Sequence, residues 1–142
     1  MKRILIAEDD EDTLHLLKRL LCCQDVDCEA VINGQLAIEA YDRAQREKRP
    51  FDLLTLDAAM PHKTGYEVTE HVRKGCFDAV PIIIVTAHTE PLAKPHADYA
   101  GATDLWTKPI DPTKFKERVQ SLLRGEPREN WSQSGVNKMS AY

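Results

Sequence analysis

The sequence of 142 residues contains no long hydrophobic run and no secretion signal. No stretch approaches the roughly 18 consecutive apolar residues that a membrane-spanning helix requires. The N-terminus, MKRILIAEDD, is basic, then apolar for only a few residues, and then acidic. A signal peptide has a longer apolar region and a small-residue cleavage site. We therefore expect a cytoplasmic protein without membrane insertion.

The sequence also lacks a long basic run. It contains 19 Lys and Arg against 23 Asp and Glu, a formal net charge of -4, so we expect no direct binding of nucleic acid. The length predicts a single domain, over residues 1–124. Residues 125–142 are polar and contain Gly, Pro and Ser, which predicts a flexible C-terminal tail.

Cysteine is scarce, with four residues and no C-x-x-C pair. In a cytoplasmic protein this spacing favours free, mostly buried thiols over disulfides, and we expect that state for Cys22, Cys23, Cys28 and Cys76. The histidines outside the pocket described below, which include His71, are interpreted as surface residues.

Short apolar runs alternate with helical patterns along the chain. Strands are predicted over residues 3–7, 28–32, 53–56, 82–86 and 104–107, and helices over 12–22, after the turn Asn33-Gly34, over 65–74, over 95–99 and from 112 onward. The fourth helix is predicted to be short because Pro91 and Pro95 interrupt it. Strands that alternate with helices indicate an α/β fold with a mostly parallel sheet.

Charged and hydroxyl side chains follow four of these strands at the point where each strand ends. They are Glu8, Asp9 and Asp10 after the first strand, Asp57 after the third, Thr86 at the end of the fourth, and Lys108 after the fifth. The carboxyl ends of parallel strands meet at one edge of the sheet. Carboxylates at this density suit Mg²⁺, or Mn²⁺. Together with a lysine and a hydroxyl they predict phosphoryl transfer to an aspartate.

This ordered set of motifs resembles the receiver domain of two-component response regulators, over residues 2 to about 124. The acidic pair is Glu8-Asp9, and Asp57 is followed four and eight residues later by Pro61 and Gly65. The remaining motifs are Thr86-Ala87 and Lys108-Pro109, which the family joins by a cis peptide. The resemblance implies a doubly wound, flavodoxin-like sheet of five parallel strands in the order 2-1-3-4-5.

The resemblance also implies a role for each matching residue. Asp57 would be the phosphoacceptor, and Thr86 and Lys108 would engage the phosphoryl group. Asp9 and Asp57 would bind Mg²⁺ directly, Glu8 through water, and Ala59 through its main-chain carbonyl.

The phosphoryl group would come from a histidine kinase or a phosphorelay protein. The domain would assist its own phosphorylation and dephosphorylation and would not be an enzyme acting on an external substrate. As a stand-alone receiver it would act through an unknown downstream protein. Asp10 is interpreted as the start of the following helix, and His88 is predicted to affect the lifetime of the phosphorylated state.

One departure from the family keeps an alternative open. Leu105 stands where the family often has a Tyr or Phe that moves with the threonine, and Trp106 should face the other side of its strand. The alternative is a degenerate receiver that binds proteins without phosphorylation. Two further classes are disfavoured. An aspartyl phosphatase would want an acid at Ala59, and a flavodoxin-like cofactor site would not tolerate three acids after the first strand.

Overall fold

The computed structural model describes residues 1–87 and 89–125, so the predicted tail beyond residue 125 and His88 lie outside the described residues. Five parallel strands form one sheet in the order β2-β1-β3-β4-β5, as the resemblance implied. The elements follow one another as β1 (Lys2–Ala7), α1 (Glu11–Leu21), β2 (Val26–Val31), α2 (Gly34–Arg46), β3 (Leu53–Asp57), α3 (Gly65–Glu70), the π-helix η1 (His71–Gly75), β4 (Ile82–Thr86), α4 (Ala93–Ala100), β5 (Asp104–Thr107) and α5 (Pro112–Leu123).

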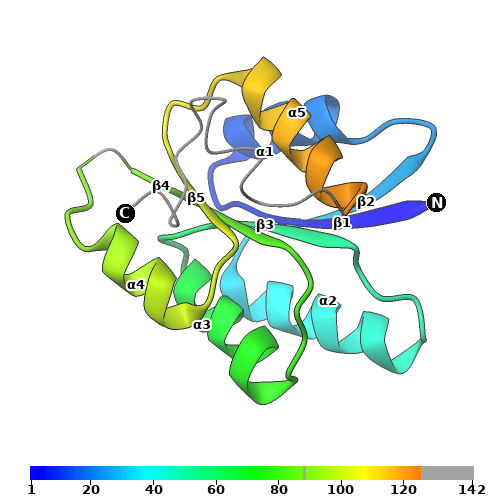
Figure 1. The fold of residues 1–142 in the computed structure, drawn as a ribbon, viewed down its shortest axis with the longest axis horizontal. Coiled ribbons are helices and arrows are strands. Elements are labelled where there is room, and N and C mark those ends of the chain that lie inside the picture. Colours follow the sequence, from blue (N-terminus) through cyan, green and yellow to red (C-terminus); the bar gives the residue numbers. More distant parts are fainter. Residues whose placement is uncertain (88, 126–142) are drawn as a thin grey trace.

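The helices form two layers, with α1 and α5 on one face of the sheet and α2, α3 and α4 on the other (Figure 1). Each central strand alternates its side chains between the two layers. In β1, Leu5 packs toward the layer of α2 to α4, whereas Ile4 and Ile6 pack toward α1 and α5. Both faces are therefore covered, which explains why the central strands read as continuous apolar runs.

Two predicted elements differ from the structure at their ends. The second strand runs over Val26–Val31, not 28–32, because Val26 pairs with Lys2 at the start of β1. The fourth helix, α4, is longer than predicted. Pro95 is only its third residue, in the first turn, where backbone N–H groups have no partner within the helix and proline costs little.

The third helical segment was predicted as one continuous helix over residues 65–74. It is a short α-helix that continues into the π-helix η1 without a break. Within η1, the Arg73 guanidinium donates to the carbonyls of Val80 and Gly101, at 2.6 and 2.8 Å. The sequence pattern carried no sign of the π-helical turn, because apolar periodicity does not distinguish it from a final α-helical turn.

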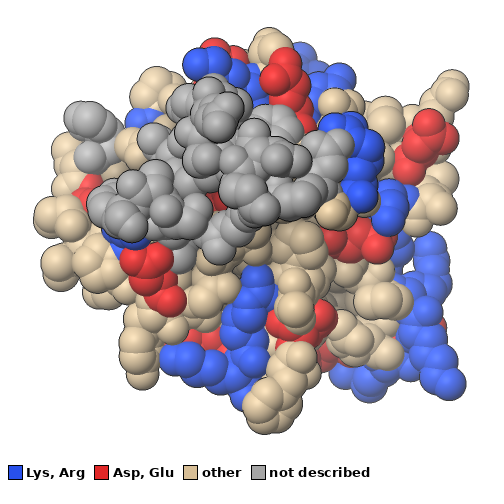
Figure 2. Space-filling view, in the orientation of Figure 1, with Lys and Arg blue, Asp and Glu red and all other residues tan. Residues whose placement is uncertain are grey.

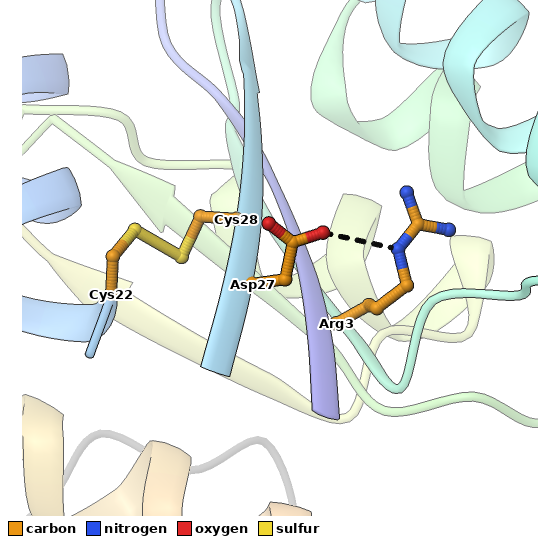
Figure 3. Close-up of a disulfide and its surroundings, with 4 residues drawn as sticks. All are labelled: Arg3, Cys22, Asp27 and Cys28. Carbon is orange, nitrogen blue, oxygen red and sulfur yellow. Dashed lines mark ion pairs between the residues drawn. A yellow bond between two sulfur atoms is a disulfide. The ribbon is translucent and has the colours of Figure 1, made fainter. Parts of the chain in front are cut away.

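The prediction for the cysteines is wrong. Cys22, which caps the C-terminus of α1, forms a disulfide with Cys28 of β2, with a Cα–Cα separation of 5.8 Å (Figure 3). Asp27, the residue before Cys28 in β2, forms an ion pair with Arg3 of β1, with 3.5 Å between Asp27 Oδ2 and Arg3 Nε. Cys23 and Cys76 are free thiols, as expected, but both are exposed and not buried.

The face of the molecule seen in Figure 2 carries acidic and basic side chains interspersed between uncharged ones. No helix within residues 1–87 and 89–125 combines the length and the apolar character that crossing a membrane requires.

Candidate functional site

The carboxyl ends of β1, β3 and β5 bring three charged side chains together at one edge of the sheet. Glu8 follows β1, Asp57 is the last residue of β3, and Lys108 follows β5. The Lys108 ammonium nitrogen lies 3.2 Å from Glu8 Oε1 and 3.4 Å from Asp57 Oδ2. Three residues that are far apart in the sequence thus form one ionic cluster, as the strand pattern predicted.

Backbone contacts hold this cluster in position. The N–H of Ala58 donates to the carbonyl of Val85, and the N–H of Lys108 donates to the carbonyl of Thr86, each at 2.8 Å. The Lys108-Pro109 peptide is cis, which confirms the expectation from the resemblance. These backbone hydrogen bonds extend the strand ladder into the loops that carry the cluster.

Gly65 allows α3 to start directly against the end of β3. A Cβ atom at this position would lie 2.4 Å from the Asp57 carbonyl oxygen, well inside any real contact. The N–H of Gly65 donates to the carbonyl of Ala58 at 3.0 Å. The glycine that the sequence places eight residues after Asp57 is therefore required by close packing against the end of β3.

The electrostatics of Asp57 are unusual for a carboxylate. Burial, followed by the hydrogen bond and charge of Glu8, raises the pKa of Asp57 to about 8, and Lys108 opposes this only in part. Burial works to lower the pKa of Lys108, but Asp57 and Glu8 together raise it above its ordinary value. The site thus holds more negative charge than its single lysine neutralises.

This excess of negative charge fits a bound cation. Oxygen atoms of Glu8, Asp9 and Asp57 all lie within 4.8 Å of one another. Glu8 and Asp57 are buried while Asp9 is exposed, so the cluster has an open side. Hard carboxylate oxygens with access to water match the preference of Mg²⁺. The residues of this cluster could therefore hold a metal ion, and the main-chain ligand at Ala59 stays a prediction.

Asp10 has a different role from its two neighbours, as predicted. It is the N-cap of α1, and its side chain accepts hydrogen bonds from the backbone N–H and the hydroxyl of Thr13, at 3.0 and 2.5 Å. Its own N–H donates to Glu8 Oε2 at 3.0 Å. Asp10 therefore orients Glu8 and lies outside the group of three clustered carboxylates.

Thr86 ends β4 at the same edge and is almost fully buried. Beside it lies a surface hollow of about 470 Å³, lined among others by Ala59, Thr86, Glu90 and Tyr99. The side chain of Tyr66 also lines this hollow, and its hydroxyl is buried without a hydrogen bond among the described residues. Burial raises the pKa of Tyr66, and the nearby Thr86 hydroxyl counteracts that in part.

Tyr66 is the site residue that the sequence interpretation missed. The helical pattern counted it only as an apolar position of the third helix. A buried tyrosine hydroxyl usually has a polar partner. A tyrosine directly after Gly65 could therefore have been interpreted as a polar group near the site. In the structure its ring packs edge-on against His96 of α4, with centroids 5.2 Å apart, which places α4 against the Thr86 side of the site.

Leu105 and Trp106 face opposite layers, as the alternation predicted. Leu105 packs toward α2 to α4, whereas Trp106 packs on the α1 and α5 side, where its ring meets Phe115 edge-on with centroids 5.1 Å apart. The position of the family's mobile aromatic residue is thus filled by an aliphatic side chain, and the tryptophan lies in a different layer.

A doubly wound α/β sheet with acids, a hydroxyl and a lysine at its carboxyl edge defines the class of aspartate-based signalling receivers. The family model of the response regulator receiver domain matches residues 4–120, and the chain belongs to this family. The complete set of acids, threonine and lysine does not favour the alternative of a degenerate receiver.

Several relatives with curated names are transcriptional regulatory proteins. The chain is 34% identical over 122 residues to the transcriptional regulatory protein YrkP of Bacillus subtilis, which covers 86% of this chain and 49% of that protein. It is 29% identical to the transcriptional regulatory protein CpxR of Escherichia coli, covering 96% of this chain and 54% of that protein. The chain therefore spans about half the length of these two regulators.

Among solved structures, the chain resembles the receiver domain of a signal transduction histidine kinase from Syntrophus aciditrophicus. The TM-score is 0.75 at 29% identity, and the match covers 88% of this chain and 92% of that one. The match thus spans nearly the whole of a receiver domain.

Proposed function

We propose that this domain accepts a phosphoryl group on Asp57 from the phosphohistidine of a histidine kinase or phosphotransfer protein, and that it signals in the cytoplasm by binding a downstream protein. The observation that carries this proposal is the contact of the Lys108 ammonium with both Glu8 and Asp57 at the carboxyl edge of the sheet.

In the proposed reaction, an Asp57 carboxylate oxygen forms a bond to phosphorus while the bond from phosphorus to the donor imidazole nitrogen breaks. The imidazole leaves with the electron pair of that bond and takes up a proton. Mg²⁺, bound by Asp9 and Asp57 and by Glu8 through water, would supply positive charge for the phosphoryl oxygens. Ala59 would add its carbonyl oxygen to that metal site.

Lys108 and Thr86 would stabilise the product. The Lys108 ammonium would exchange its contact with Asp57 for a phosphoryl oxygen, while Thr86 would donate its hydroxyl to another. This would draw Thr86 toward Asp57 and away from Tyr66. Because Tyr66 contacts His96, the rearrangement would reach α4 and change the surface that a partner reads.

The test is phosphorylation by acetyl phosphate with Mg²⁺, followed by intact mass. We expect one phosphoryl group on the wild-type chain and none on Asp57→Asn. The matched control is Asp10→Asn, which changes a neighbouring acid that caps α1 and should still be phosphorylated. No mass gain with acetyl phosphate or with any phosphohistidine donor, or an equal gain in Asp57→Asn, would refute the proposal.

A further inference from the structure

A second group of potential ligands lies at the opposite end of the sheet from the acidic cluster. It consists of Asp42 near the C-terminus of α2, His71 at the start of η1, and Cys76 directly after η1. Helices in this fold run antiparallel to the strands, so their C-terminal ends lie at the amino edge of the sheet (Figure 1). The group is thus separate from the site at Asp57.

The donor atoms of this group converge on one point. His71 Nε2 lies 2.8 Å from Asp42 Oδ1 and 3.9 Å from Cys76 Sγ, and all three donors lie within 4.8 Å of one another. Tetrahedral coordination by nitrogen, oxygen and sulfur at normal Zn²⁺ distances separates the donors by roughly 3.3–3.6 Å. Small side-chain rotations would therefore bring the three donors to coordination distance.

The π-helical turn is what brings the thiol to the imidazole. The N–H of Cys76 donates to the carbonyl of His71 at 3.1 Å, a contact that spans five residues. In an α-helix, residues i and i+5 point to different sides of the helix. In a π-helical turn, which has more residues per turn, they point to nearly the same side. Single π turns occur often at functional sites, and this one gathers two ligand types that the sequence interpretation assigned to unrelated surface and core positions.

The surroundings favour a cation and leave room for it. Asp78, held by the Tyr41 hydroxyl at 2.5 Å, adds negative charge beside the thiol. Asp42 and Cys76 line a surface hollow of about 710 Å³, together with Tyr41 and Phe77 among others. Solvent can thus reach the open side of the group.

We propose that Asp42, His71 and Cys76 bind a divalent transition-metal ion of the Zn²⁺ class, with water in the fourth position. Imidazole and thiolate ligands select such ions over Mg²⁺ and Ca²⁺, which take oxygen ligands. On binding, the Cys76 thiol releases its proton to solvent and the thiolate sulfur becomes a ligand. The domain would then hold two chemically different metal sites at opposite ends of one sheet.

The test uses Co²⁺ as a spectroscopic substitute for Zn²⁺, on the full chain without reductant and with excess Mg²⁺ to occupy the acidic cluster. We expect one equivalent of Co²⁺ to produce a thiolate-to-cobalt charge-transfer band, and Zn²⁺ to abolish the band by displacement. Cys76→Ser, His71→Ala and Asp42→Asn should each weaken binding roughly tenfold or more, and Cys76→Ser should remove the band.

Cys23→Ser is the matched control, because Cys23 is the other free, exposed thiol and lies in the connection between α1 and β2, whereas Cys76 follows η1. It should keep both the band and the affinity. Phosphorylation by acetyl phosphate and the thermal midpoint report whether each variant is folded. A wild-type chain without the band overturns the proposal. So does a band that persists in Cys76→Ser, or one that disappears in Cys23→Ser.

Discussion

Asp57 combines two properties that are in conflict within the metal-free protein. It must be ionised to act as the proposed nucleophile, yet burial and the adjacent Glu8 raise its pKa to about 8. A folded-state pKa above the unfolded value means that the folded state binds more protons. This group therefore contributes stability that is present below about pH 4 and is lost as the pH rises toward 8.

We predict that Asp57→Asn stabilises the metal-free protein at pH 8, on the order of 1–3 kcal/mol, and that this gain shrinks as the pH falls toward 5. The full pKa shift of Asp57 would correspond to a larger gain in stability. The gain is smaller because Lys108 loses the charge of Asp57 as a partner in the variant. Urea unfolding in EDTA at pH 5, 6, 7 and 8 measures the trend. Added Mg²⁺ should stabilise only the wild-type chain, because a ligand that binds the folded state raises its stability. A gain that falls as the pH rises would contradict the electrostatics described for the site.

At the scale of elements, the start of α3 depends on the missing side chain at Gly65. We predict that Gly65→Ala costs roughly 2 kcal/mol or more and slows phosphorylation, because the new Cβ must displace the Asp57 carbonyl, 2.4 Å away. Gly75→Ala is the matched control, since its nearest neighbour would be His71 Nδ1 at an ordinary 3.8 Å. Chemical denaturation and the rate of phosphorylation by acetyl phosphate compare the two. An equal effect of both substitutions would show that close packing at Gly65 is not the cause.

A second pair of elements, β5 and α5, is joined by a fully buried ion pair. The Arg118 guanidinium makes two contacts with Asp104, Nε to Oδ2 at 2.5 Å and Nη2 to Oδ1 at 2.8 Å. The sequence interpretation placed neither residue in the core. A charged residue is normally predicted to lie at the surface, and a partner 14 residues away cannot be recognised from the local pattern.

We predict that Arg118→Met destabilises the domain by about 3–5 kcal/mol, because it leaves the Asp104 carboxylate buried without its partner. The double variant Asp104→Leu with Arg118→Met should recover much of this loss, since two apolar side chains need no compensation. Urea unfolding of the single and double variants measures both effects. A double variant that is less stable than Arg118→Met would indicate that the ion pair itself contributes net stability.

At the scale of the whole molecule, the Cys22–Cys28 disulfide ties α1 to the edge strand β2. β2 is the least buried strand of the sheet and lies at its edge, where it pairs with β1. Short closed loops of this kind stabilise a fold by about 2 kcal/mol. In a reducing compartment the two residues would be thiols.

We predict that protein purified without reductant contains two thiols that react with Ellman's reagent, Cys23 and Cys76. After reduction and unfolding, all four cysteines should react. Cys28→Ser should lower the unfolding free energy in non-reducing buffer by about 2 kcal/mol and change it little in reducing buffer. Four reactive thiols in the native, unreduced protein would contradict the disulfide.

The sequence by itself determined the order of strands and helices along the chain and the charged residues at the strand ends, and its resemblance to a known family implied the receiver fold. The order of the elements and the residues at their ends follow from local rules, since apolar periodicity, helix caps and strand ends are each encoded within a few neighbouring residues. Asp10 as a helix cap and the opposite orientation of Leu105 and Trp106 were predicted correctly for the same reason.

Only the tertiary structure decided which side chains meet across elements. The Cys22–Cys28 disulfide, the pair of Asp104 with Arg118, the approach of Tyr66 to Thr86, and the convergence of Asp42, His71 and Cys76 all depend on how helices pack on the sheet. Such contacts arise from helix rotation and from one π-helical turn. Neither leaves a periodic signal in the sequence, because a shift of a single residue in register changes which side chains face each other.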